Sequence, residues 1–167
     1  MTNLEACHSP GSIACFDPVF LLRSKLMRQT NNGRQRWAMS VAVEISFGEL
    51  IDKITILEIK AGVADDEASR RNVMHELALL QARRTQSLPE TPRLTTLQNE
   101  LKAINQRLWA IEDRLRVKEG DQQFDQEFIA LARDVYLTND QRSRVKRSVN
   151  DEFKSAIVEE KIFTRET

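Results

Sequence analysis

Cysteine and histidine are scarce in this sequence, and their scarcity excludes several kinds of site. The 167 residues include two cysteines and two histidines. Cys7 and Cys15 both lie within the first 38 residues, so the rest of the chain has no disulfide framework and no thiolate metal site. His75 is the only histidine beyond residue 38, and no second histidine follows it four residues later. We therefore expect no metal site and no cofactor.

Glycine and proline are also rare, with five and four residues, and the remaining composition favours helix. No apolar run reaches the roughly 18 residues that a membrane-spanning helix needs. A secretory signal carries its positive charge before an apolar region, whereas here the basic residues follow the apolar stretch. These absences lead us to expect a cytoplasmic, mainly helical protein with no membrane partner.

Charge is balanced over the whole chain but not along it. Five of the 25 basic and two of the 25 acidic residues lie in residues 1–38, which leaves 20 basic and 23 acidic residues in 39–167. A mildly acidic domain is not typical of a nucleic-acid binder. Residues 1–38 are interpreted as a disordered leader or a mis-assigned start, with Met39 as the true first residue. Residues 39–167 are predicted to form a single helical domain.

The most apolar helix-length stretch is Ile45–Val63. Ser46 and Glu49 have the spacing of a capping box, and Gly62 favours a helix end at Ala61. Its apolar residues fall on two sides of the helix, which predicts burial between partners. The main face consists of Phe47, Leu50, Ile51, Ile54, Leu57 and Ala61. The second face, on nearly the opposite side, consists of Ile56, Ile59 and Val63.

Two acidic residues, Asp52 and Glu58, interrupt these apolar faces. A carboxylate in apolar surroundings needs a partner or a raised pKa. We favour a structural ion pair for each of them. A ligand-binding or catalytic carboxylate is the alternative that the sequence leaves open.

The strongest periodic pattern follows Thr91-Pro92, where threonine is expected to cap a helix and proline to occupy its first turn. Leucine and isoleucine then recur at alternating spacings of three and four residues up to Leu115, and Gly120 is expected to end the helix. At 1.5 Å per residue this helix is about 42 Å long. The recurring positions are Leu94, Leu97, Leu101, Ile104, Leu108, Ile111 and Leu115.

The remaining stretches predict three further helices and a short β pair. One helix is expected over residues 67–86 after Asp65 or Asp66, and another begins near Asp121. A third is expected over 139–153, because Thr138 and Gln141 have capping-box spacing. Residues 41–45 alternate like a strand, and the candidate partner is 155–163, which fits either a short strand or a last helical turn. The predicted fold class is all-α, an antiparallel bundle of about five helices with a long heptad-patterned helix and an optional two-stranded end.

The segments Ile45–Lys60, Ile104–Asp113, Phe128–Arg133 and Glu159–Lys161 resemble an uncharacterised bacterial family, a domain of unknown function. The resemblance covers about residues 43–163 and implies no activity. It does single out polar residues that packing does not require. They are Asp52, Glu58, Asn72, Asn105, Glu112, Arg133, Tyr136, Asn139, Lys146, Arg147 and Glu160.

No nucleotide-binding loop, nucleophile elbow or metal-binding helix pair appears in residues 39–167. We therefore favour a non-catalytic interaction or accessory protein that self-associates or binds a protein partner. The alternative is a small-molecule enzyme or binder, in which Glu58 or Glu112 faces a pocket beside Arg133 and Arg147 that holds an anionic phosphate or sugar-phosphate. Nucleic-acid binding is the least favoured of the three. The candidate ligand-binding residues are Asp52, Glu58, Asn105, Glu112, Arg133, Tyr136, Asn139, Lys146 and Arg147.

Overall fold

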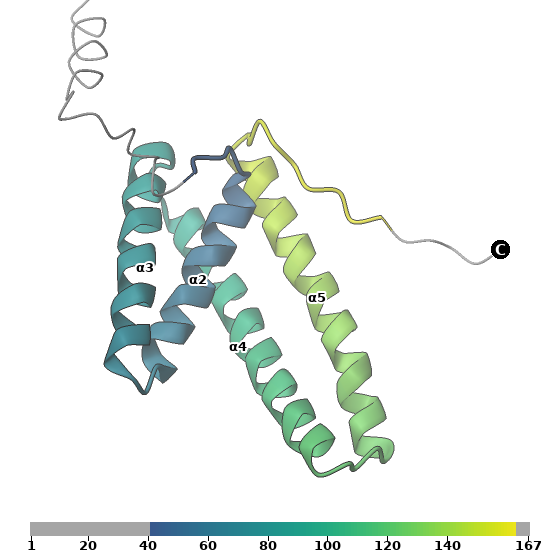
Figure 1. The fold of residues 1–167 in the computed structure, drawn as a ribbon. Coiled ribbons are helices and arrows are strands. Elements are labelled where there is room, and N and C mark those ends of the chain that lie inside the picture. Colours follow the sequence, from purple (N-terminus) through teal and green to yellow (C-terminus); the bar gives the residue numbers. More distant parts are fainter. Residues whose placement is uncertain (1–40, 163–167) are drawn as a thin grey trace, which may run out of the picture. The chain divides into compact units, whose positions relative to one another are not determined.

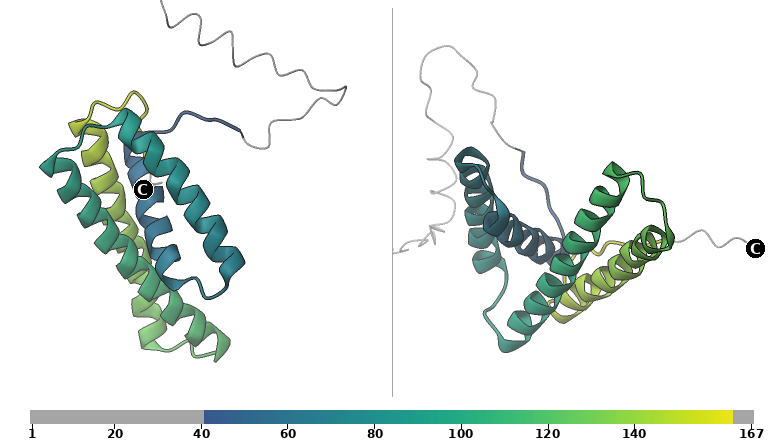
Figure 2. Two further views of the ribbon diagram at one scale, coloured as in Figure 1. Left: turned by 90° about the vertical axis from the view of Figure 1, so that its left-hand side faces the viewer. Right: turned by 90° about the horizontal axis from the view of Figure 1, so that it is seen from below.

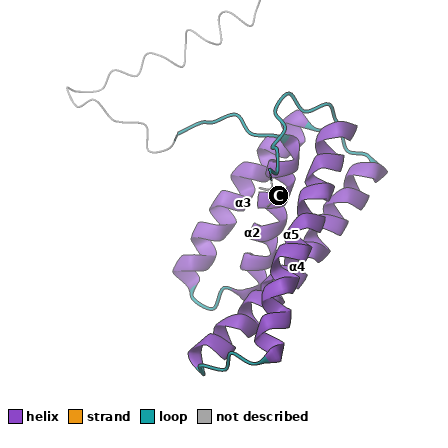
Figure 3. Ribbon diagram, turned by 90° about the vertical axis from the view of Figure 1, so that its right-hand side faces the viewer, coloured by secondary structure: helices purple, strands orange, loops and turns teal. Residues whose placement is uncertain are grey.

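The structure, a computed structural model, describes residues 41–162 and contains four helices in that range (Figure 1). They are α2 (Phe47–Val63), α3 (Glu67–Ser87), α4 (Pro92–Gly120) and α5 (Gln126–Glu152). The all-α prediction is confirmed for these residues. The expected β pair is not formed by the described part of the chain, because residues 41–46 and 155–162 contain no strand (Figure 3).

Local capping signals place the helix starts where the sequence predicts them. Ser46 accepts a hydrogen bond from the Glu49 N–H at 3.0 Å, and Thr91 accepts one from the Leu94 N–H at 3.1 Å. Asp66 caps α3 in the same way. The predicted end of α2 at Ala61 is wrong. Gly62 continues the helix to Val63, and the Ala64 N–H closes it on the Lys60 carbonyl.

The helix predicted to start near Asp121 and the one predicted for residues 139–153 are one continuous helix, α5, which Asp125 caps. The expected capping box at Thr138 is therefore wrong. Thr138 lies seven residues after Leu131 and seven before Val145, and all three side chains are buried. Because this spacing keeps Thr138 on the packed face, the helix continues through it.

α2 lies between α3 and the antiparallel pair α4–α5, as the views in Figures 1 and 2 agree. Ile51 packs with buried side chains of α4 and α5, whereas Ile54 packs with Leu77 of α3. The heptad positions of α4 are used inside the chain. Leu94, Leu97, Leu101, Leu108 and Ile111 are all buried.

The second apolar face of α2 is not enclosed as predicted. Val63 is exposed, and Ile56 and Ile59 are only half-buried. The reason is the direction of the helices. The turn that joins α4 and α5 lies away from α2 and α3 in Figures 1 and 3, so the distal part of this hairpin does not cover the second face. No helix within residues 41–162 is long and apolar enough to cross a membrane.

Candidate functional site

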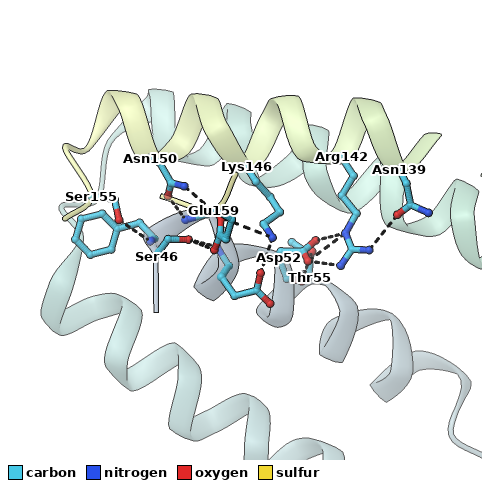
Figure 4. A network of polar contacts seen from close by, with 12 residues as sticks. Ser46, Asp52, Thr55, Asn139, Arg142, Lys146, Asn150, Ser155 and Glu159 are labelled. Carbon is cyan, nitrogen blue, oxygen red and sulfur yellow. Dashed lines mark hydrogen bonds and ion pairs between the residues drawn. The ribbon is translucent and has the colours of Figure 1, made fainter. Parts of the chain in front are cut away.

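A network of polar side chains joins α2 to α5, and Asp52 is at its centre (Figure 4). The Asp52 side chain is 1% exposed. Arg142 Nε donates to its two carboxylate oxygens at 2.9 and 3.1 Å, and Nη2 donates a further hydrogen bond. Asn105 of α4 donates through Nδ2 at 2.8 Å. Because a buried charge is costly unless it is paired and hydrogen-bonded, these donors make the buried carboxylate tolerable.

Thr55 and Asn139 complete this part of the network. The Thr55 hydroxyl donates to the Asp52 carbonyl at 2.8 Å and accepts from Asn105 Nδ2 at 2.9 Å. Asn139 accepts from Arg142 Nη1 at 3.3 Å. The Asp52 hydrogen bond raises the pKa of Arg142, and the fields of Glu49 and Glu112 act in the same direction. The guanidinium therefore stays charged, and α2, α4 and α5 are held together at one point.

Side chains from the end of α5 and from the segment that follows it form hydrogen bonds with the N-terminus of α2. The Gly48 N–H donates to Asn150 Oδ1 at 2.7 Å, and the Phe47 N–H donates to Ser155 Oγ at 3.2 Å. The Ser46 hydroxyl donates to Glu159. The first N–H groups of a helix lack partners within the helix, and here tertiary contacts supply them.

Gly48 lies at a close contact between α2 and α5. A Cβ at this position would lie 2.5 Å from the Lys146 carbonyl oxygen and 3.0 Å from Asn150 Oδ1. Lys146 itself turns to Glu49, which uses its carboxylate for this ion pair with α5. The close contact between the two helices therefore requires glycine.

The segment that follows α5, residues 155–161, returns along the same helix, and we call it the C-terminal strap. Glu160 pairs with Arg147 at 3.0 Å, and Lys161 pairs with Asp140. Glu159 lies 3.9 Å from Lys146 Nζ. Two adjoining hollows of about 270 and 370 Å³ lie between α5 and the strap. Both are lined by Ser143, Arg147, Glu159, Glu160 and Lys161, so they form one groove, which we call the strap groove.

The structure brings together some of the residues that the sequence singled out. Asp52, Asn105 and Asn139 belong to the α2–α5 network. Asn139, Lys146 and Arg147 line the strap groove. The ion pair that the sequence favours for Asp52 is present.

The other predicted residues lie elsewhere. Glu58 pairs with Lys102 at 2.7 Å, and Glu112 pairs with Arg116 of its own helix at 3.2 Å. Arg133 and Tyr136 are exposed on α5. Neither Glu58 nor Glu112 lines the groove that contains Arg147, so the pocket predicted from these residues is not assembled there. Within residues 41–162 no group of three His, Cys, Asp or Glu side chains is arranged to hold a metal ion.

Arg142 is a central residue of the network that sequence reasoning missed. It belongs to a basic run with Arg144, Lys146 and Arg147, and such a run is typical of a solvent-exposed helix face. A helical signal could have separated it from its neighbours. Arg142 lies four residues after Thr138 and seven before Val149, both of which are buried, whereas Arg144 and Arg147 fall on the exposed side. An arginine on the packed face of α5 is the partner that a carboxylate on the apolar face of α2 requires.

Comparison with known proteins gives a family but no activity. No curated protein and no solved structure matches the chain. Residues 41–166 match a family of unknown function, DUF6165, over most of the chain's length. The resemblance that the sequence suggested is thereby confirmed as membership of an uncharacterised family. The chain belongs to the family of unknown function DUF6165.

Proposed function

We propose that this chain is a non-catalytic helical interaction protein that self-associates through an exposed stripe, which begins just before α5 and continues along its first half. The stripe consists of Phe124, Ile129, Ala132, Arg133 and Tyr136. The observation that carries the proposal is the exposure of its large side chains. Phe124, Ile129 and Tyr136 are 58%, 43% and 56% exposed.

The spacing of the stripe supports a packing role. Ile129, Ala132 and Tyr136 stand at i, i+3 and i+7, so they lie on one side of the helix. The side chains of α5 that bond to α2 come from residues 142–150, beyond the stripe. α2 therefore leaves this side of the helix without cover, and a second helix has room to pack on it.

Arg133 adds a polar anchor to the apolar stripe. It lies between Ile129 and Tyr136 on the same side, and it forms no ion pair within the described residues. Tyrosine and arginine are the residue types that dominate binding energy in protein interfaces. An unpaired arginine beside an exposed tyrosine is thus suited to a partner surface, and an acidic residue of a second copy would complete the pair.

The heptad pattern of α4 does not carry this proposal. Its apolar positions pack within the chain, so a coiled coil between copies along α4 would require the fold to open. The small-molecule alternative is also weaker in its original form, because Glu58 and Glu112 have ion-pair partners away from Arg147. Its anion-binding part stays a prediction for Asn139, Lys146 and Arg147.

The test is the molar mass of the full chain in solution, measured by light scattering across a concentration series. We expect the wild type to form a dimer or larger species. Tyr136→Glu should shift it to the monomer, because it removes the aromatic ring from the stripe and puts a charged group, which is costly to bury, in its place. Leu79→Glu is the matched control. Leu79 is 56% exposed on α3, away from the stripe.

Thermal unfolding of both variants separates association from folding. Residue 136 is exposed, so Tyr136→Glu should leave the folded monomer intact. A wild type that remains monomeric at every concentration contradicts the proposal. So does a dimer that Leu79→Glu disrupts while Tyr136→Glu does not.

A further inference from the structure

A polar hollow lies between α3 and α4. Among the described helices α3 packs on α2 alone, so no helix packs on its side toward α4. The hollow has a volume of about 420 Å³, which is within the range of small-molecule sites. Each wall is one side of a helix, because its residues are spaced at i, i+3 and i+4. The lining residues are Ile54 of α2, Gln81, Arg84 and Thr85 of α3, and Thr95, Gln98 and Asn99 of α4.

The charge at this hollow is balanced. Arg84 is its only charged lining residue, and the Arg84 Nη1 and Nη2 atoms donate to the two carboxylate oxygens of Glu90, with 2.8 Å between Nη2 and Oε2. The Arg84 side chain is only 14% exposed, so its charge is partly withdrawn from water and already has its partner. No acidic residue of the described chain lines the hollow. An ionic ligand would therefore bring a charge that the lining does not balance, and the hollow suits a neutral ligand.

The polar groups of both walls are open to a ligand. The Thr85 and Thr95 hydroxyls donate to carbonyls one turn earlier in the chain at 3.1 and 3.3 Å, which leaves their oxygens as acceptors. The three carboxamides form no hydrogen bond within residues 41–162, so each offers an NH₂ donor and a carbonyl acceptor. These carboxamides belong to Gln81, Gln98 and Asn99.

One further donor at this hollow lacks a partner. Arg84 Nε is buried and forms no hydrogen bond within the described residues. Thr138 Oγ1 is the only other buried side-chain nitrogen or oxygen of residues 41–162 in this condition, and it lies elsewhere, on α5. A buried donor without an acceptor is unfavourable. An acceptor oxygen that enters beside Arg84 removes this cost once the side chain shifts to uncover Nε.

A hydroxyl is the neutral group that matches this lining. It donates to a threonine or carboxamide oxygen and accepts from a carboxamide NH₂ or from Arg84 Nε. Several hydroxyls on one small molecule can use both walls at once. We propose that the hollow between α3 and α4 binds a small neutral polyol, held mainly by the carboxamides of Gln81, Gln98 and Asn99. The site is separate from the exposed stripe, so the two proposals fail or succeed independently.

The experiment is a titration of the full, ¹⁵N-labelled chain with myo-inositol and, separately, with cyclohexanol, which has the same carbon ring but a single hydroxyl. We expect saturable shifts of the side-chain NH₂ signals of Gln98 and Asn99 and of the Arg84 Nε–H signal with myo-inositol. Cyclohexanol should bind more weakly, because it fills the space but leaves most of the polar groups without a partner. Sodium acetate at constant ionic strength should also bind more weakly, because the lining is neutral.

Variants identify the groups involved. Gln98→Met keeps the length of the side chain but removes its amide, and it should weaken the binding of myo-inositol about three- to tenfold. Thr95→Val removes an exposed hydroxyl from the same wall and should weaken binding about two- to fivefold. Gln106→Met is the matched control, because Gln106 is exposed on the same helix outside the hollow, and it should bind like the wild type. Thermal unfolding checks that each variant is folded.

Four results overturn the proposal. The first is the lack of saturable shifts with myo-inositol in the wild type. The second is equal or tighter binding of cyclohexanol, which would mark apolar contact alone. The third is tighter binding of acetate, which would mark a charged site. The fourth is the same affinity for myo-inositol in Gln98→Met, Thr95→Val and Gln106→Met, which would place the ligand outside the hollow.

Discussion

At the scale of single residues, a glycine, which has no side chain, and a buried ion pair hold α2 against α5. Gly48 allows the backbones to approach until its N–H reaches Asn150. Asp52, one turn further along, meets Arg142 on the same neighbouring helix. Steric fit and charge therefore act on the same contact, and each can be changed without the other.

Gly48→Ala should destabilise the fold even though alanine is the better helix former. The added Cβ meets the Lys146 carbonyl at 2.5 Å, so one of the helices must shift, at about 1–3 kcal/mol. Gly62→Ala is the matched control. It lies in the same helix with nothing within 4 Å of its Cβ and should gain about 0.5–1 kcal/mol. Urea unfolding measures both changes, and equal effects of the two substitutions would contradict the close contact.

Asp52→Asn should lower the free energy of unfolding by about 2–4 kcal/mol, because Arg142 would lose its partner while only 29% of its side chain is exposed. Glu58→Gln removes a carboxylate from the same helix, but its pair with Lys102 is more open to water. That change should cost less than about 1 kcal/mol. Chemical unfolding of the two variants compares them, and a larger loss for Glu58→Gln would show that the network is not the main polar support.

The sequence predicted half of this contact. Asp52 on an apolar face required a partner, and that requirement follows from desolvation alone. The identity of the partner did not follow, because Arg142 is 90 residues away and local spacing does not specify which helices meet. The role of Gly48 was not predicted for the same reason. Its close approach to Lys146 is a property of helix packing.

At the scale of elements, the turn between α4 and α5 is held by charges. Lys118 near the end of α4 pairs with Asp125, the cap of α5, and with Glu127 in its first turn, each at 2.9 Å. Arg114 also pairs with Glu127. Carboxylates at the start of α5 and cations at the end of α4 both suit the helix dipoles.

These pairs predict how the turn responds to pH. Lys118 lowers the pKa of Asp125 below its ordinary 3.8 and that of Glu127 below 4.5, and the two acids raise the pKa of Lys118 above 10.5. The acids therefore stabilise the turn above their ordinary pKa values, and this contribution is lost as the pH falls through their lowered values. The contribution of Lys118 is complete below 10.5 and is lost as the pH rises through its raised value.

NMR titration of the Asp125 carboxyl checks this response. Its midpoint should lie below 3.8 in the wild type and move upward in Lys118→Gln, because the largest cause of the lowered pKa is the Lys118 hydrogen bond. The Phe128 N–H still bonds to Asp125 in this variant, so part of the lowering should remain. A wild-type midpoint at or above 3.8 would contradict the geometry of the turn.

Helix starts were more predictable than helix continuity. Ser46, Asp66 and Thr91 cap their helices through contacts within three residues, and such contacts are visible in the sequence. Thr138 has the same spacing to Gln141 but lies inside α5. Thr138 is buried against the rest of the described unit, and the helix continues through it. This burial depends on tertiary packing, which a local sequence pattern does not report.

At the scale of the whole described unit, four helices enclose a core and leave one side of the α4–α5 hairpin open. The main face of α2, the heptad positions of α4 and the packed face of α5 are used internally. The stripe from Phe124 to Tyr136 is not. A surface that combines exposed aromatic residues with an arginine that forms no ion pair in residues 41–162 is the basis for the proposed self-association.

The most direct test of this account is an isotope-filtered NOE experiment on a mixture of ¹³C-labelled and unlabelled full-length chains. It detects only contacts between different copies. The account predicts such contacts between the Tyr136 ring and the Ile129 methyl groups of another copy, and their loss in Tyr136→Glu. Intermolecular contacts that arise only from α3, or none at concentrations where the chain is larger than a monomer, would contradict it.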